Sequence, residues 1–97
     1  MATIKLFKLF TGLEVVGEEI DSTDTTITIK RPYIFNYVPQ GQDTYGLSLE
    51  VYSFADPDGV HKFGLSAIAS FSVTVPADIE KTYLQQTSGI SIISSLN

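Results

Sequence analysis

The sequence contains no cysteine and a single histidine, and both shortages limit the chemistry that it can perform. Without cysteine there is no disulfide, thiolate nucleophile, cysteine-ligated zinc site or iron–sulfur cluster. The lone His61 excludes metal motifs built on a histidine pair, and we interpret it as an exposed strand residue. We therefore predict that the protein is not an enzyme and has no catalytic residues, no metal site and no cofactor.

Basic residues and long apolar runs are also scarce. Six Lys and Arg residues stand against eleven Asp and Glu residues, which gives a net charge of −5. This balance argues against DNA as a partner, because phosphate contacts dominate the affinity of DNA-binding proteins. No run approaches the roughly 18 apolar residues of a membrane span, and no targeting signal is recognisable. We expect a cytoplasmic protein without a membrane partner.

Apolar and polar residues alternate with a period of two along much of the chain, which is 43% hydrophobic. A chain of 97 residues suits one hydrophobic core, so we expect a single domain over residues 1–97. The pattern predicts five strands, one helix and a tail, which lie in chain order at about 4–10, 14–21, 25–38, 45–54, 60–75, 77–88 and 90–97.

Two of these strands contain features that should interrupt them. Run straight, residues 60–75 would span on the order of 50 Å at about 3.3 Å per residue, which is too long for a domain of this size. We expect a bend or a break near Ala67 to Ser70, and whether the segment is one bent strand or two stays open. Pro32 cannot donate a ladder hydrogen bond, so the strand over 25–38 should bend, bulge or reach a sheet edge there.

The connections and the helix complete the expected fold. Residues 39–43 are predicted to form a loop, and Asp56–Gly59 has the composition of a tight turn. Pro76 is typical of a helix start, and Ile79 and Tyr83 are four residues apart, so they share a face that can dock on the sheet. The predicted fold class is all-β: a small, strongly bent, five-stranded SH3-like barrel with one C-terminal α-helix.

The first thirty residues carry a more specific pattern, in which Gly12, Val15, Gly17, Ile20 and Asp24 follow an apolar strand. This spacing resembles the first sequence motif of the Sm and Sm-like family. Gly12 would serve a tight turn, and Gly17 would permit strong bending where strands cross closely. The chain as a whole is similar to Sm-like proteins of tailed phages, including cyanophages. The resemblance implies an Sm-like barrel, a homo-oligomeric ring closed by strand pairing, and a place in the host cytoplasm.

The chain departs from the family at positions connected with RNA. Thr25 and Thr26 occupy the region in which the family usually has an Asn that contacts RNA bases. The second family motif, Ile-Arg-Gly, has its nearest counterpart at Phe63-Gly64, where Phe63 replaces the arginine. The predicted helix also follows the strands. The resemblance therefore implies the ring more directly than it implies RNA binding.

Self-association is the activity that the residues themselves favour most. Residues 4–10 have apolar side chains on both faces, more than a lone chain of this size needs to bury, and the edges of a small open barrel must be covered or used. The alternative is that this strand lies inside the protein with both faces buried. The predicted subunit-interface residues are Leu6, Phe7, Leu9, Phe10, Phe71 and Val73.

RNA binding is the main alternative function. Lys30 and Arg31 precede Tyr33 and Phe35, and basic residues beside aromatic rings suit single-stranded nucleic acid. In a ring, one such basic pair per subunit would gather on one face. Alternatively, the aromatic residues belong to the core or to the subunit interface. The five acidic residues of 14–24 are interpreted as a solvated face.

Together these observations predict a non-catalytic Sm-like protein of phage origin that forms a homo-oligomeric ring and acts as a scaffold or binding platform. An RNA-binding Sm-like protein of the RNA chaperone type is the first alternative. A structural component of a phage virion or tail is the second, because an acidic, β-rich chain without catalytic residues would suit that role as well.

Overall fold

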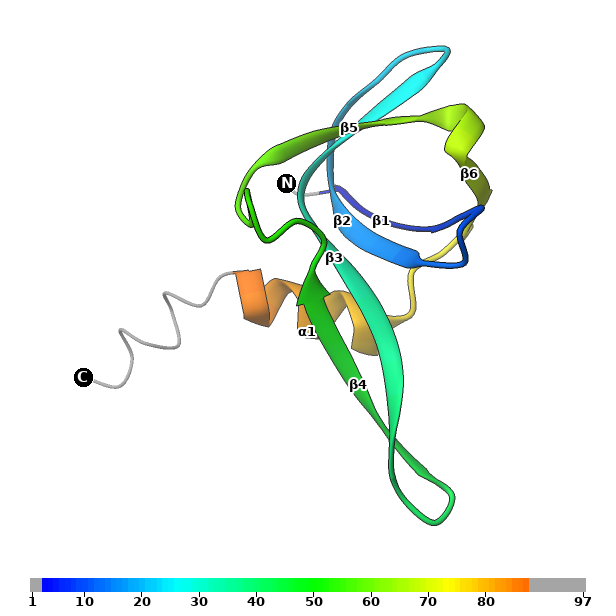
Figure 1. Ribbon diagram of the computed structural model, residues 1–97, viewed down its shortest axis with the longest axis vertical. Helices are drawn as coiled ribbons and strands as arrows, with labels where there is room; N and C mark the ends of the chain where they lie inside the picture. The colour runs from blue at the N-terminus through cyan, green and yellow to red at the C-terminus, as the bar shows by residue number, and fades with distance from the viewer. Residues whose placement is uncertain (1–2, 88–97) are drawn as a thin grey trace, which may run out of the picture.

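The computed structural model of the chain describes residues 3–87, and the predicted tail at 90–97 lies outside them. The described part is mostly β-structure with one C-terminal helix (Figure 1). Its elements are β1 (Thr3–Leu9), β2 (Glu14–Ser22), β3 (Thr26–Gly41), β4 (Thr44–Val51), β5 (Val60–Gly64), the 3₁₀ turn η1 (Leu65–Ala67), β6 (Ile68–Phe71) and α1 (Ala77–Thr87).

The strands form one antiparallel sheet in the order β4-β3-β2-β1-β6. Strand β5 pairs with the first part of β3 (residues 26–30), and β4 pairs with the part that follows (residues 33–41). The all-β class and the C-terminal helix are thus confirmed, but the five-stranded barrel is wrong. Residues 3–87 contain six strands, and no ladder joins β6 to β4 or β5. The sheet curls without closing, and the chain passes from β5 to β6 through η1 (Figure 1).

The expected break in residues 60–75 is present. It falls at η1, slightly before the small side chains at which it was predicted, and it separates β5 from β6. The strand also ends sooner than expected, because Ser72 to Pro76 run across to the helix. The predicted turn at Asp56–Gly59 is confirmed by a bond of 3.2 Å from the Gly59 N–H to the Asp56 carbonyl.

The third strand is longer than its pattern indicates. Residues 39–43 were predicted to be a loop, yet the ladder with β4 continues through Pro39 opposite Tyr45. Gly41 (φ 147°) and Asp43 (φ 62°) then make the hairpin turn, in backbone conformations that favour residues such as Gly, Asn and Asp. Pro39 is tolerated because this part of β3 has a partner on one side only.

Gly17 lies where β2 crosses β3 most closely. A Cβ atom at this position would overlap Cγ2 of Ile29 and would lie 3.3 Å from Cα of Pro32. The register between β2 and β3 shifts between Val16 and Glu18, so Gly17 also sits at a bulge. The prediction that this glycine permits close crossing is confirmed. Gly12 (φ 98°) occupies the turn after β1, also as predicted.

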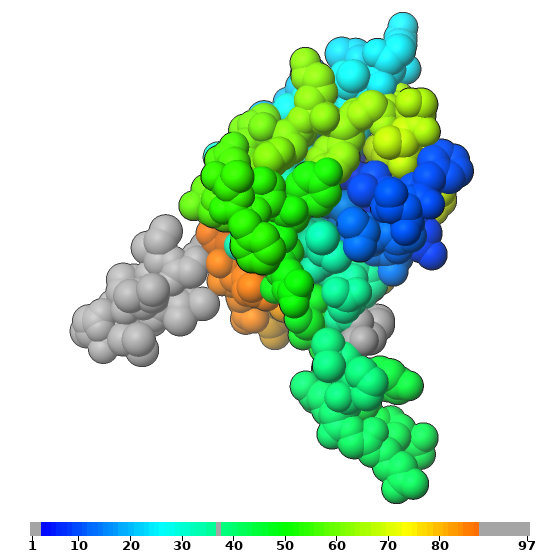
Figure 2. Space-filling model, viewed as in Figure 1, coloured from blue at the N-terminus to red at the C-terminus, as the bar shows by residue number. Residues whose placement is uncertain are grey.

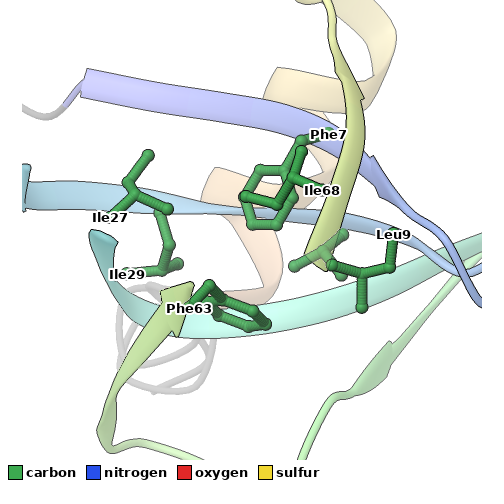
Figure 3. Packing of buried hydrophobic residues seen from close by; sticks show 7 residues of the cluster. Phe7, Leu9, Ile27, Ile29, Phe63 and Ile68 are labelled. Carbon is green, nitrogen blue, oxygen red and sulfur yellow. The ribbon is translucent and has the colours of Figure 1, made fainter. Parts of the chain in front are cut away.

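Two hydrophobic clusters occupy the two faces of the curled sheet. The first lies inside the curl, where side chains from β1, β2, β3, β5 and β6 converge (Figure 3). Its members are Phe7, Leu9, Val15, Ile27, Ile29, Phe63 and Ile68. The second lies under α1, whose Ile79 and Tyr83 are both 2% exposed, as the shared helix face predicts. It also contains Leu6, Val16, Phe35 and Leu49.

Candidate assembly surface

The predicted subunit-interface residues divide into two groups. Leu6, Phe7 and Leu9 are buried inside the single chain, so their assignment to a subunit interface is wrong. The reason is that β1 is covered on both faces, by the cluster under α1 on one side and by the cluster inside the curl on the other. The alternative of a strand buried on both faces is therefore correct for this segment.

The other three residues are exposed and lie beside β6. Phe10 is 72% exposed, Phe71 44% and Val73 99%. The Phe10 N–H donates to the Ala67 carbonyl at 3.0 Å, which holds Phe10 at the start of β6. Phe71 is the last residue of β6, and the centre of its ring lies 5.6 Å from that of Phe7. These exposed apolar side chains lie at both ends of β6, where they are available for contact with another protein.

The outer edge of β6 has no partner strand in residues 3–87. The Ser72 N–H donates to the Leu6 carbonyl. Because hydrogen-bonded and non-hydrogen-bonded pairs alternate, the next pair, Phe71 opposite Phe7, is a non-hydrogen-bonded pair of the β1–β6 ladder. The N–H and C=O groups of Phe71 therefore point away from β1, toward the open edge. A second strand can pair with them there.

The edge of β5 is open in the same way. The β3–β5 ladder has a hydrogen bond at each end: the Arg31 N–H donates to the Gly59 carbonyl, and the Leu65 N–H donates to the Thr25 carbonyl. These two bonds show which residues of β5 are hydrogen-bonded to β3. Alternation then turns the backbone N–H and C=O of Lys62, and of Val60 and Gly64 on either side, away from β3. The ladders of the described residues join β5 to β3 alone. Sequence reasoning missed this edge, since apolar alternation reports which face is buried and not which strand stays unpaired.

The predicted RNA-binding residues are also divided. Lys30 and Arg31 are partly exposed. Phe35 is 8% exposed within the cluster under α1, and Tyr33 packs against that cluster with its ring 5.8 Å from the ring of Tyr83. The predicted role of Phe35 as a stacking platform is therefore wrong, because its ring packs in the core, which was the other option for it. Tyr33 is only partly buried, and its role stays a prediction.

Tyr83 fixes the backbone of the basic pair. Its hydroxyl donates to the carbonyl of Lys30 at 3.0 Å and to that of Arg31 at 2.9 Å. Arg31 has a positive φ of 51°, an uncommon conformation for a residue with a side chain. Burial raises the pKa of Tyr83 to about 12, so the hydroxyl keeps its proton and remains a donor.

The remaining polar residues form small local contacts. His61 lies on β5 as predicted but is half-buried: its Nε2 is 3.2 Å from the Asp56 carbonyl, and its ring meets that of Tyr52 edge to face at 5.7 Å. Among the acidic residues of 14–24, Glu19 pairs with Lys5 at 3.6 Å. In residues 3–87, no three His, Asp or Glu side chains gather in a group that could hold a metal ion.

No family model matches the chain, and no curated protein sequence matches it. Within the described residues, no helix is both long enough and apolar enough to cross a membrane. Binding of another protein chain would use the open edges of β5 and β6 and the exposed apolar residues beside β6.

Proposed function

We propose that this chain is a non-catalytic Sm-like protein of phage origin whose copies join edge to edge into a homo-oligomeric ring, and that the ring acts as a scaffold or binding platform. The observation that carries the proposal is that β5 and β6, like the terminal strand β4, each have an unpaired edge within the described residues, and that exposed apolar residues lie beside β6. Unpaired edges are an aggregation hazard unless a protein covers or uses them.

A joint between the two edges would be head to tail. The β5 edge of one copy would pair with the β6 edge of the next, so each copy would use two different surfaces. Such a contact repeats from copy to copy and gives a ring when the rotation closes, or a filament when it does not. The joint would also cover Phe71 and Val73, the exposed apolar residues at the end of β6.

The Sm-like part of the proposal is supported by the bent antiparallel sheet and by its two motif glycines. Gly12 takes the positive φ of the first turn, and Gly17 lies at the bulge where two strands cross too closely for a side chain. These are the roles that the motif spacing implies.

The oligomeric state tests the proposal directly. Light scattering of the purified full chain should give a discrete mass several times that of one 10.6-kDa chain. In Lys62→Pro, the backbone N–H that faces the open edge is lost and no β3 bond is removed, so the mass should fall toward that of one chain. The matched control, Lys62→Thr, keeps the N–H and should assemble normally.

A second variant acts on the other edge. Val73 is almost fully exposed in the single chain, so Val73→Lys should leave folding intact, as judged by circular dichroism, and should still weaken the assembly. A wild-type chain that stays monomeric at its highest soluble concentration would overturn the ring. So would an oligomer whose mass neither variant changes.

RNA binding and a virion role stay predictions from the sequence. The partial exposure of Lys30 and Arg31 favours the first of them, since each copy in a ring would present one such pair. The second would gain support if the protein were found in purified phage particles.

A further inference from the structure

The outer halves of β3 and β4 form a two-stranded arm that projects from the body. The pairing of β2 with β3 ends at Val15 opposite Ile34, whereas the β3–β4 ladder continues to Gly41 opposite Thr44. Residues 36–48, called the arm below, therefore have no third strand beside them. Figure 2 shows the arm standing clear of the rest of the molecule, and in Figure 1 it extends beyond α1.

The two faces of the arm differ in polarity. Antiparallel partners share a face, so Pro39, Tyr45 and Leu47 lie on the same face as Phe35 and Leu49, which are core residues under α1. That apolar row runs outward from buried Leu49 through half-buried Leu47 to Tyr45, which is 64% exposed. The opposite face carries Asn36, Val38, Gly46 and Ser48, and the Gln40 side chain lies over Gly46.

The stability and the charge of the arm both favour contact with another protein. An isolated two-stranded hairpin is marginally stable in water, and one whose apolar face has no cover gains little from its own packing. Asp43, at the tip, is the one charged residue of 36–48, and there is no basic residue to bind phosphate. These properties favour a protein surface over a nucleic acid as the partner of the arm.

The proposed strand joint is small compared with a stable interface between two proteins, which favours a second copy of this chain as the partner of the arm. The joint is limited by the four residues of β6, so it is about 13 Å long and about 10 Å deep, and its strands hide on the order of 130 Å² per chain, to which the side chains of Phe71 and Val73 add. A stable interface hides about 800 Å² per partner. The strand joint therefore needs a second contact between the same two copies, and the arm is the projecting element with an uncovered apolar face.

We infer that the arm lays its Tyr45 face on the neighbouring copy of this chain and supplies a second contact between subunits, beside the strand joint. The inference rests on the proposed function, because it requires the copies to be joined. It adds the residues that hold them together and assigns the arm to a second copy of the chain.

Photo-crosslinking of the purified full chain tests this inference. p-Benzoylphenylalanine in place of Tyr45 should yield covalently linked pairs of chains on irradiation. The matched control places the same group at Val38, on the opposite face of the same arm, and should give several-fold fewer linked pairs. Equal yields at the two positions, or no linked pairs in an oligomer of normal mass, would overturn the role of the arm and leave the proposed ring in place.

The strength of association provides an independent measurement. Tyr45→Ser should weaken association of the copies at least tenfold, as loss of a central aromatic contact does, whereas Val38→Ser should change it less than about twofold. Both residues are exposed in the single chain, so neither variant should disturb its folding. Unchanged association in Tyr45→Ser would contradict the inference. If the wild-type chain is monomeric, the ring and the role of the arm both fail.

Discussion

The two ends of β3 belong to one continuous strand but lie in opposite surroundings. Thr26–Lys30 is flanked by β2 on one side and β5 on the other, and Ile27 and Ile29 are buried inside the curl. Residues 36–41 pair with β4 alone, and Val38 is 44% exposed. Both ends have apolar side chains, but only the inner end has a strand on each side and lies in the core.

The change takes place at Arg31 and Pro32. The positive φ of Arg31 turns the strand, and beyond it the partner on the outer side changes from β5 to β4. Tyr83 holds this point from the helix by donating to two consecutive carbonyls. Three experiments test the difference between the inner and outer ends of β3.

Ile29→Ala should have the largest effect. Ile29 is fully buried and packs at the Gly17 crossing, so truncation leaves a cavity and should lower the free energy of unfolding by about 3 to 4 kcal/mol. Urea unfolding at a fixed chain concentration measures this, since assembly adds to apparent stability. The control is the same truncation at Ile20, which is 49% exposed. Equal losses at the two positions would contradict the assignment of Ile29 to the core.

Removal of the Tyr83 hydroxyl should have an intermediate effect. Tyr83→Phe removes the one hydroxyl hydrogen that the carbonyls of Lys30 and Arg31 share and should cost about 1 to 2 kcal/mol near neutral pH. The pKa of this tyrosine is raised from 10.0 to about 12 in the folded protein. Between those values the unfolded chain loses a proton that the folded chain keeps, so stability is full below pH 10 and falls as the pH rises.

The expected slope is about 1.4 kcal/mol per pH unit in that window. Urea midpoints measured from pH 10 to pH 12 should therefore fall less steeply in Tyr83→Phe than in the wild type. Tyr33→Phe is the control, because it leaves Tyr83 in place and should keep the slope. A wild-type slope that survives in Tyr83→Phe would show that another group causes it.

Val38→Ala should have the smallest effect, at most about 0.5 kcal/mol, because its side chain is exposed on the arm and leaves no cavity when truncated. The same urea titration measures it. A loss comparable to that of Ile29→Ala would mean that the outer end of β3 contributes to folding as much as the inner end does.

Local residue patterns were sufficient to predict the elements with a local cause. The helix begins at Ala77 as predicted and runs to the last described residue, Thr87; Pro76 and the acidic first turn act on the backbone at its start. The turn at Asp56–Gly59, the tight turn at Gly12 and the close approach at Gly17 are likewise confirmed. The loop predicted at 39–43 was wrong because proline is compatible with a strand that lacks a neighbour on one side.

The candidate site was less predictable. The exposed residues beside β6 were anticipated, but Leu6, Phe7 and Leu9 were not separated from them, because alternation cannot distinguish an interface from a second core. Tyr33 and Phe35 were open to both readings for the same reason. The open edge of β5 had no signal in the sequence at all.

The amino-acid pattern alone was enough to predict the β-class, the helix that follows the strands, the turns at Gly12 and Asp56–Gly59, and the glycine at the close approach of β2 and β3. Each of these depends on backbone preferences or on contacts a few residues apart. The folded chain was needed to learn which apolar strands are covered on both faces, which strand edges stay unpaired, and that β3 extends beyond β2 to form the arm. Those outcomes depend on which strands, distant in sequence, come to lie side by side, and the proposed assembly is built from the surfaces that they leave uncovered.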